Sequence, residues 1–248
     1  LKLGTVNMWL PSSVMASIHD EFGVFDMPFI IKDRKHMAKV EKNVLPGMFK
    51  NLEDKTGYKV IAVWENGFRH ITNNTRPINT PGDLKGIKLR TPKSKWRVKM
   101  FQSYGANPTP MSFSEVFTAL KTGTMDGQEN PYAQIASAKF QEVQKYLSIT
   151  GHVYTPAYVT VHKDHWNKLP ADVQDILEKA AQDTQKFVYK EAAKLEKSLL
   201  KVIKDAGVQV NEADKGAFIA ASKGIYDQFG SEVPTGGALV KKVSALAN

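Results

Sequence analysis

Residues 86–92 read Gly-Ile-Lys-Leu-Arg-Thr-Pro, and this segment predicts a short β-strand at residues 86–89 that is followed directly by Arg90. The loop Thr-Pro-Gly-Asp at residues 80–83 introduces the strand, and Pro92 closes it. Further strands are predicted before and after it, at residues 58–64, 148–150, 158–161 and 208–210.

Helical patterns lie between these strands. Residues 112–115 (Ser-Phe-Ser-Glu) form a capping box, and residues 130–131 (Asn-Pro) indicate a second helix start. The longest helical stretch begins near Leu169 and meets no breaker until Gly207, a length of about 50 Å. Periodicity alone leaves open whether this is one helix or two. Alternating strands and helices predict an α/β fold.

The composition is that of a soluble globular protein, with 42% hydrophobic and 24% charged residues among 248. The absence of cysteine excludes a disulfide scaffold, a thiolate nucleophile and a cysteine-ligated metal. The net charge of +9 favours an anionic partner. The basic residues are scattered from Lys2 to Lys242, which argues against a basic tail and, less strongly, against a nucleic-acid-binding stripe.

Two arginines follow predicted strands. Arg69 comes after the first strand and Arg90 after the central one. Ligands of open α/β sheets bind beyond the carboxyl ends of strands, and a guanidinium binds a carboxylate through two parallel hydrogen bonds. The alternative for each is a surface arginine with an acidic neighbour. The run of residues 93–99, basic around a tryptophan, is interpreted as a solvated helix surface.

Other candidate residues have an ordinary structural alternative. Asn130 could cap a helix or direct its amide at a ligand. Phe113 and Trp64 could lie in the core or in a cleft, and His152 could donate a hydrogen bond. The pair His162 and His165 lacks a third ligand, so no metal site is predicted. No cofactor motif and no nucleophile motif is found.

Three segments together carry a resemblance to a known family. They are residues 86–92 (GIKLRTP), 105–116 (GANPTPMSFSEV) and 125–131 (MDGQENP). With residues 22–29 (FGVFDMPF) and 66–69 (NGFR), they resemble the DctP-type solute-binding proteins of TRAP transporters over nearly the whole chain.

The resemblance implies two α/β lobes joined by crossing strands, with one long helix, residues 171–206, spanning both. The first lobe would comprise residues 1–67 and 157–196. The second would comprise residues 68–156 and 197–248 and would carry the carboxylate-binding arginine. The family's opening strand, helix and strand are not found, and the chain begins Leu-Lys-Leu-Gly, so it is interpreted as processed or trimmed.

The resemblance also implies roles for single residues. Arg90 matches the arginine that grips the ligand carboxylate, and Asn130 matches an asparagine that helps to hold the same group. Phe113 matches an aromatic side chain that packs over the ligand. Arg69 matches a second, more variable basic contact, and His152 falls at a polar ligand contact of some members.

The function expected from this resemblance is capture of a small organic acid in the periplasm, without catalysis or cofactor. Delivery would be to the small and large membrane subunits of a transporter driven by an ion gradient. The alternatives are a lyase or hydrolase acting on an organic acid, and a nucleic-acid-binding module.

The acid itself stays open at this point. Arg69, Lys93 and Arg97 would suit a dicarboxylate. Hydroxyl groups of a sugar or hydroxy acid would suit His70, Asn73, Asn74 and His152, and an aromatic acid would suit Trp64, Phe68, Phe113 and Tyr154. A small hydroxy or keto acid is preferred.

Overall fold

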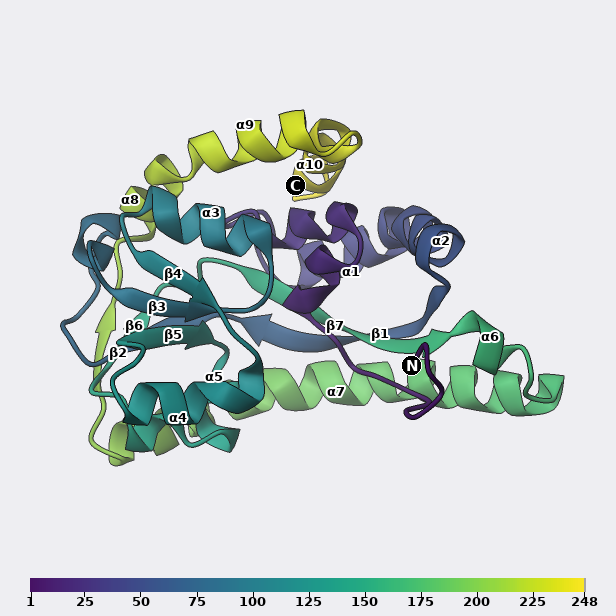
Figure 1. The fold of residues 1–248 in the computed structure, drawn as a ribbon, viewed down its shortest axis with the longest axis horizontal. Helices are drawn as coiled ribbons and strands as arrows, with labels where there is room; N and C mark the ends of the chain where they lie inside the picture. The colour runs from purple at the N-terminus through teal and green to yellow at the C-terminus, as the bar shows by residue number, and fades with distance from the viewer. Residues whose placement is uncertain (248) are drawn as a thin grey trace.

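The computed structural model describes residues 1–247, so Asn248, the last residue of the predicted second lobe, lies outside the described part. Two β-sheets lie side by side along the long axis of the molecule (Figure 1). The larger is a six-stranded mixed sheet whose strands occur in the order β4 (Asn107–Pro110), β3 (Lys88–Thr91), β5 (Gly127–Asn130), β2 (His70–Asn73), β6 (Tyr146–Ile149) and β8 (Gln209–Glu212).

The smaller sheet consists of β1 (Tyr58–Phe68) paired antiparallel with β7 (Tyr154–His162). Its two strands run directly into the larger sheet. Arg69 alone separates β1 from β2, and residues 150–153 separate β6 from β7. The expected two-lobed α/β fold with crossing strands is therefore confirmed, and the crossing occurs at these two short connections.

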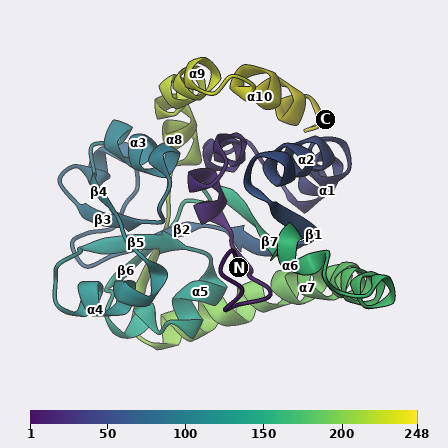
Figure 2. The ribbon, with the colours of Figure 1, turned by 45° about the vertical axis from the view of Figure 1, so that its right-hand side comes forward.

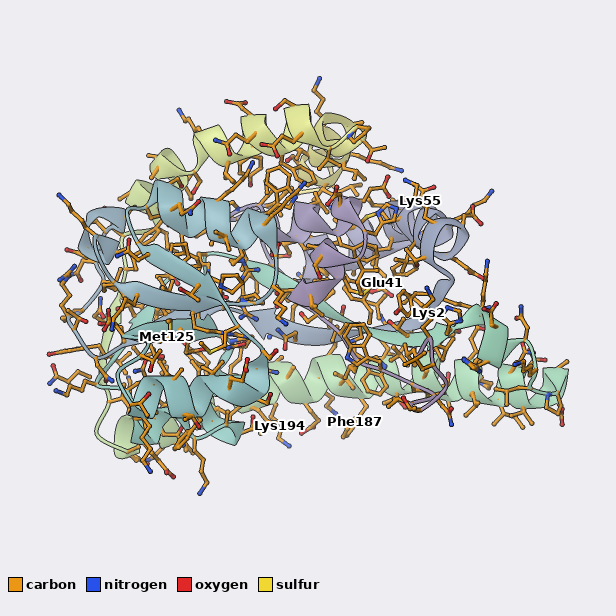
Figure 3. The ribbon with its side chains drawn as sticks, in the orientation of Figure 1. Lys2, Glu41, Lys55, Met125, Phe187 and Lys194 are labelled. Carbon is orange, nitrogen blue, oxygen red and sulfur yellow. The ribbon has the colours of Figure 1, made fainter. Side chains whose placement is uncertain are left out.

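One helix underlies both sheets. Helix α7 (Ala171–Asp205) has 35 residues and packs against β1 and against α5 (Tyr132–Ser137). At the usual rise it is about 52 Å long. Figures 1 and 2 show it passing beneath the whole molecule. The single long helix is confirmed. Phe187, on its outer side, points away from the body and is 64% exposed (Figure 3).

Several helices cover the opposite side, whereas α4 (Val116–Lys121) and α5 lie on the same side as α7. Helices α1 (Arg34–Asn43) and α2 (Leu45–Thr56) lie by the smaller sheet, and α3 (Lys95–Ser103) lies by the larger one (Figure 2). Three C-terminal helices pass above both sheets. Of these, α9 (Lys223–Glu232) packs on α3, and α10 (Gly236–Ala245) packs on the 3-10 helix η2 (Asp20–Asp26). The other helical segments are η1 (Ser13–Ser17), η3 (Pro81–Leu84), η4 (Phe113–Glu115), η5 (Phe140–Glu142), α6 (Lys163–Trp166) and α8 (Lys215–Ala221).

Local chemistry explains where several elements begin and end. The predicted capping box forms, because the backbone N–H of Ser112 donates to Glu115 Oε2 at 3.1 Å. Gly57 ends α2 in the left-handed conformation, with φ of 76°. None of the helices within residues 1–247 is both long and apolar enough to cross a membrane.

The five predicted strands are confirmed, with shifted ends, as β1, β3, β6, β7 and β8. The helix start predicted at residues 130–131 was wrong in detail. Asn130 ends β5, and α5 begins at Tyr132 without a side-chain cap. Strand β5 reads Gly-Gln-Glu-Asn and is buried throughout, so it has none of the apolar alternation by which strands are found.

Candidate ligand-binding site

Arg90 is a buried arginine without an acidic partner. It lies on β3 and is only 3% exposed. Its Nε and Nη2 donate to the carbonyl oxygen of Met111 at 3.0 and 2.6 Å. It forms no ion pair with any carboxylate of residues 1–247. Burial and the neighbouring Arg69 lower the pKa of Arg90 to about 10, so its charge is retained at neutral pH but is poorly compensated.

Glu129 lies at the centre of the buried charges beside Arg90. It occupies β5, and its Oε2 accepts from Arg69 Nε at 2.5 Å and from Arg97 Nη1 at 2.7 Å. Burial alone would raise the pKa of Glu129, but Arg69 and Arg97 overcome that effect and hold the pKa far below its usual range. Nη2 of Arg69 also donates to the backbone oxygen of Glu129, so the Nε–Nη2 edge of its guanidinium is hydrogen-bonded within the protein.

His152 completes this cluster. Its Nε2 lies 3.0 Å from Glu129 Oε2, and its Nδ1 lies 2.7 Å from the hydroxyl of Thr150. Burial lowers the pKa of His152, although Glu129 opposes the shift. The neutral imidazole therefore joins the crossing segment of residues 150–153 to the buried glutamate.

Arg97 corrects the sequence interpretation of residues 93–99. The side chain was assigned to a solvated helix surface, but it is fully buried. Its Nη2 lies 2.5 Å from Oδ1 of Asp26 on η2, and Nη1 binds Glu129. Asp26 also accepts from the hydroxyl of Ser94. The interpretation failed because helical spacing shows which residues share a face but not what that face contacts. Here the face with Arg97 meets the buried carboxylates of Asp26 and Glu129.

Phe113 lies by the same arginine, and Asn130 lies on β5, the strand that pairs with the strand of Arg90. Asn130 ends β5 and is 3% exposed, and its Nδ2 donates to Gln128 Oε1 at 2.6 Å. Phe113 is 44% exposed, although it is a large aromatic side chain. The Arg90 guanidinium lies 6.0 Å from the centre of the Phe113 ring. An exposed ring beside a buried cation is available to cover a bound molecule.

Trp64 does not lie beside Arg90 and the residues around it. Its Nε1 donates to the carbonyl oxygen of Ala181 on α7 at 2.9 Å, which anchors β1 to the long helix. The structure thus gathers Arg69, Arg90, Asn130, Phe113 and His152 around the crossing strands and leaves Trp64 on the far side of β1.

The sequence reasoning missed Glu129 and Asp26. Both lie in segments that were recognised, but neither was singled out. With them the balance of the buried cluster is three guanidinium groups against two carboxylates, an excess of one positive charge. Such a site attracts a single anionic group. Residues 1–247 contain no cluster of three or more histidine, aspartate or glutamate side chains able to hold a metal ion.

Residues 1–232 match the family described as bacterial extracellular solute-binding protein, family 7, or DctP. The chain belongs to this family. The DctP relatives include the 2,3-diketo-L-gulonate-binding periplasmic protein YiaO of Escherichia coli, 39% identical over 98% of this chain and 75% of its own length. The sialic acid-binding periplasmic protein SiaP of Vibrio cholerae is 33% identical over 99% of this chain and 73% of its own.

Solved DctP-type structures share the fold. A TRAP periplasmic solute-binding protein from Polaromonas, bound to D-erythronate, superposes with a TM-score of 0.92 at 35% identity, covering 98% of this chain and 80% of that one. A second, from Sulfurospirillum deleyianum with bound succinate, gives 0.93 at 33% identity, covering 99% and 81%. The predicted family is confirmed, and the comparisons favour neither the lyase or hydrolase nor the nucleic-acid-binding alternative.

Proposed function

We propose that this protein captures a small organic acid by its carboxylate and delivers it, in the periplasm, to the membrane subunits of a TRAP transporter. Arg90 carries the proposal, because a buried guanidinium without an acidic partner is costly unless a ligand supplies the missing charge. For Asn130 and Phe113 we keep the predicted roles, whereas for Arg69 and His152, which were predicted to contact the ligand, we propose a supporting role because both bind Glu129. Asn130 assists the carboxylate, Phe113 covers the ligand, and Arg69 with His152 holds the site in shape.

The charge balance favours a monocarboxylate. Arg69 and Arg97 both bind Glu129, and Arg97 also binds Asp26. The positive charges of these two guanidinium groups are therefore largely neutralised within the protein and would attract a second ligand carboxylate only weakly. A dicarboxylate would bring two charges to a site that has an excess of one. We therefore favour a hydroxylated monocarboxylate, a class to which the ligands named for the Escherichia coli and Polaromonas relatives belong.

The proposed mechanism is closure without chemistry. The carboxylate meets Arg90, and the smaller sheet with its helices then closes over the ligand and excludes water, which strengthens each polar contact. Closure follows from the higher affinity of the ligand for the closed form. No residue of the site is assigned a catalytic role.

Calorimetry with an Arg90→Ala variant tests the proposal. The panel holds D-erythronate, D-gluconate, succinate and neutral erythritol. For the acid that the wild type binds best, we expect the variant to lose about 2–5 kcal/mol, on the order of 30-fold to several thousand-fold in affinity. Arg76→Ala is the matched control, because Arg76 donates only to the backbone oxygens of Asp83 and Lys85.

Two results would overturn this assignment. One is a change of less than threefold in the Arg90→Ala variant, provided that its thermal unfolding shows a folded protein. The other is equal binding of erythritol and D-erythronate, which would mean that the carboxylate is not what the site recognises. A preference for succinate over both monocarboxylates would reject the charge argument while keeping the role of Arg90.

A further inference from the structure

A cavity lies at the connection between β1 and β2, and no residue of the buried charge cluster lines it. Its volume is about 520 Å³, within the range of small-molecule sites. Its walls come from α5, α7 and α8, from Gly151, from Phe68 and His70 on either side of the β1–β2 connection, and from Phe29, Ile31 and Lys32. None of Arg90, Asn130 and Phe113 lines it.

Aromatic side chains form much of its wall. The rings of His70 and Tyr132 stack with their centres 4.4 Å apart, and Phe29 and Phe68 contribute further apolar surface. Phe29 has a φ of 59°, which is an uncommon conformation for a bulky residue. Its backbone N–H donates to the carbonyl oxygen of His152 at 2.8 Å, which holds that conformation. These aromatic surfaces are suited to packing against a planar apolar group, such as the aromatic ring of a ligand.

The polar groups at the wall are cationic or donors. Lys32 and Lys215 line the cavity and are exposed, and neither forms an ion pair with a carboxylate of residues 1–247. The one carboxylate in the wall, Glu196, is already bound by Arg34 at 2.6 Å. The cavity therefore offers two unpaired ammonium groups to an anion.

His70 adds a directed hydrogen bond. Its Nδ1 accepts from the backbone N–H of Gly151 at 3.1 Å, so the neutral ring carries its proton on Nε2. Burial is the largest cause that lowers the pKa of His70 to about 3, followed by the electrostatic effects of His152, Lys215 and Arg69, so this imidazole is neutral at physiological pH. The ring is thus a donor at the cavity wall.

We propose that this cavity is a second ligand site, which binds a small aromatic carboxylate with its ring against Phe29, Phe68 and Tyr132 and its anionic group at Lys32 and Lys215. The site is separate from that of the transported acid. Residues 151 and 152 connect the two, because Gly151 lines the cavity while the side chain of His152 binds Glu129.

The probe for the test is 4-fluorophenylacetate, followed by ¹⁹F NMR titration of the purified protein. Its neutral counterpart is 2-(4-fluorophenyl)ethanol, which keeps the ring and lacks the charge. The test variant is the double substitution Lys32→Gln with Lys215→Gln. The matched control is Lys50→Gln with Lys121→Gln, which removes the same charge from exposed positions on α2 and α4.

We expect the wild type and the control to bind the acid within twofold of each other, and the test variant to bind it at least fivefold more weakly. The neutral alcohol should bind the wild type at least fivefold more weakly than the acid does. Arg90→Ala should leave binding of the acid unchanged. Equal binding by the test and control variants, loss of binding in Arg90→Ala, or no binding at millimolar probe would each overturn the proposal.

Discussion

Nε of Arg69 lies 2.5 Å from Oε2 of Glu129, and both side chains are buried. Arg69 is the only residue between β1 and β2, so the pair joins a crossing strand to the middle of the larger sheet. Arg97 and His152 bind the same carboxylate oxygen.

Removing the charge of Glu129 is therefore expected to destabilise the fold. Glu129→Gln leaves Arg69 and Arg97 buried with too few counter-charges, and loss of one partner from such a cluster costs about 3–5 kcal/mol. Urea denaturation measures the difference. Glu232→Gln is the control, because the pair of Glu232 with Lys99 is exposed and should contribute less than about 1 kcal/mol. A loss below 1 kcal/mol in Glu129→Gln would show that the cluster contributes little to stability.

Acid is expected to destabilise the protein through His70. Burial and its charged neighbours lower the pKa of His70 in the folded state from 6.5 to about 3. Below pH 6.5, His70 binds a proton in the unfolded chain but stays neutral in the folded one. The contribution of His70 to stability is therefore greatest above pH 6.5 and falls as the pH approaches 3.

The dependence of the free energy of unfolding on pH tests this prediction. His70 alone contributes at most about 1.4 kcal/mol per pH unit over that window. Chemical denaturation of wild type and His70→Asn at pH 7, 6 and 5 should show a shallower decline in the variant, with His165→Asn as the control. Parallel curves for all three proteins would contradict the assignment.

Trp64→Phe separates a structural role from a ligand-binding one. The substitution removes the hydrogen bond to the carbonyl oxygen of Ala181, which should cost about 0.5–1.5 kcal/mol of stability. Because Trp64 faces α7, the affinity for the organic acid should stay within twofold by calorimetry. A fivefold loss of affinity would return Trp64 to the binding site, as the sequence had suggested.

Phe113→Ala should show the opposite pattern. The ring is 44% exposed, so its removal should change the free energy of unfolding by less than about 1 kcal/mol. If the ring covers the bound acid beside Arg90, affinity should fall by about fivefold to 30-fold, equivalent to roughly 1–2 kcal/mol. Val202→Ala, on the outer side of α7, is a control of similar exposure. Unchanged affinity would remove Phe113 from the site.

Much of the fold was predictable because its decisive elements carry local patterns. The strand that ends near Arg90 and the capping box at Ser112 depend on residues next to each other in the chain. The length of α7 followed from the absence of a breaker, while its role as one helix across both sheets came from the family resemblance. The boundaries of the two lobes stay a prediction.

The charge cluster was harder to predict, because its members come from separate segments. Arg97 looks like part of a basic helix surface until Asp26 and Glu129 are placed against it. Strand β5 is polar because it carries Gln128, Glu129 and Asn130, and the lack of apolar alternation meant that the strand was not predicted. The residues that hold the site were thus the ones whose local patterns were weakest.

The two connections between the sheets have a mechanical consequence. Helix α7 is continuous along one side, so a change in the angle between the sheets has to bend it or be absorbed at Arg69 and at residues 150–153. These are the positions from which Arg69 and His152 reach Glu129. The residues at these two connections thus also hold the charge cluster beside Arg90. In the closure that we propose, a ligand that shifts the charges around Glu129 would therefore also change the angle between the two halves.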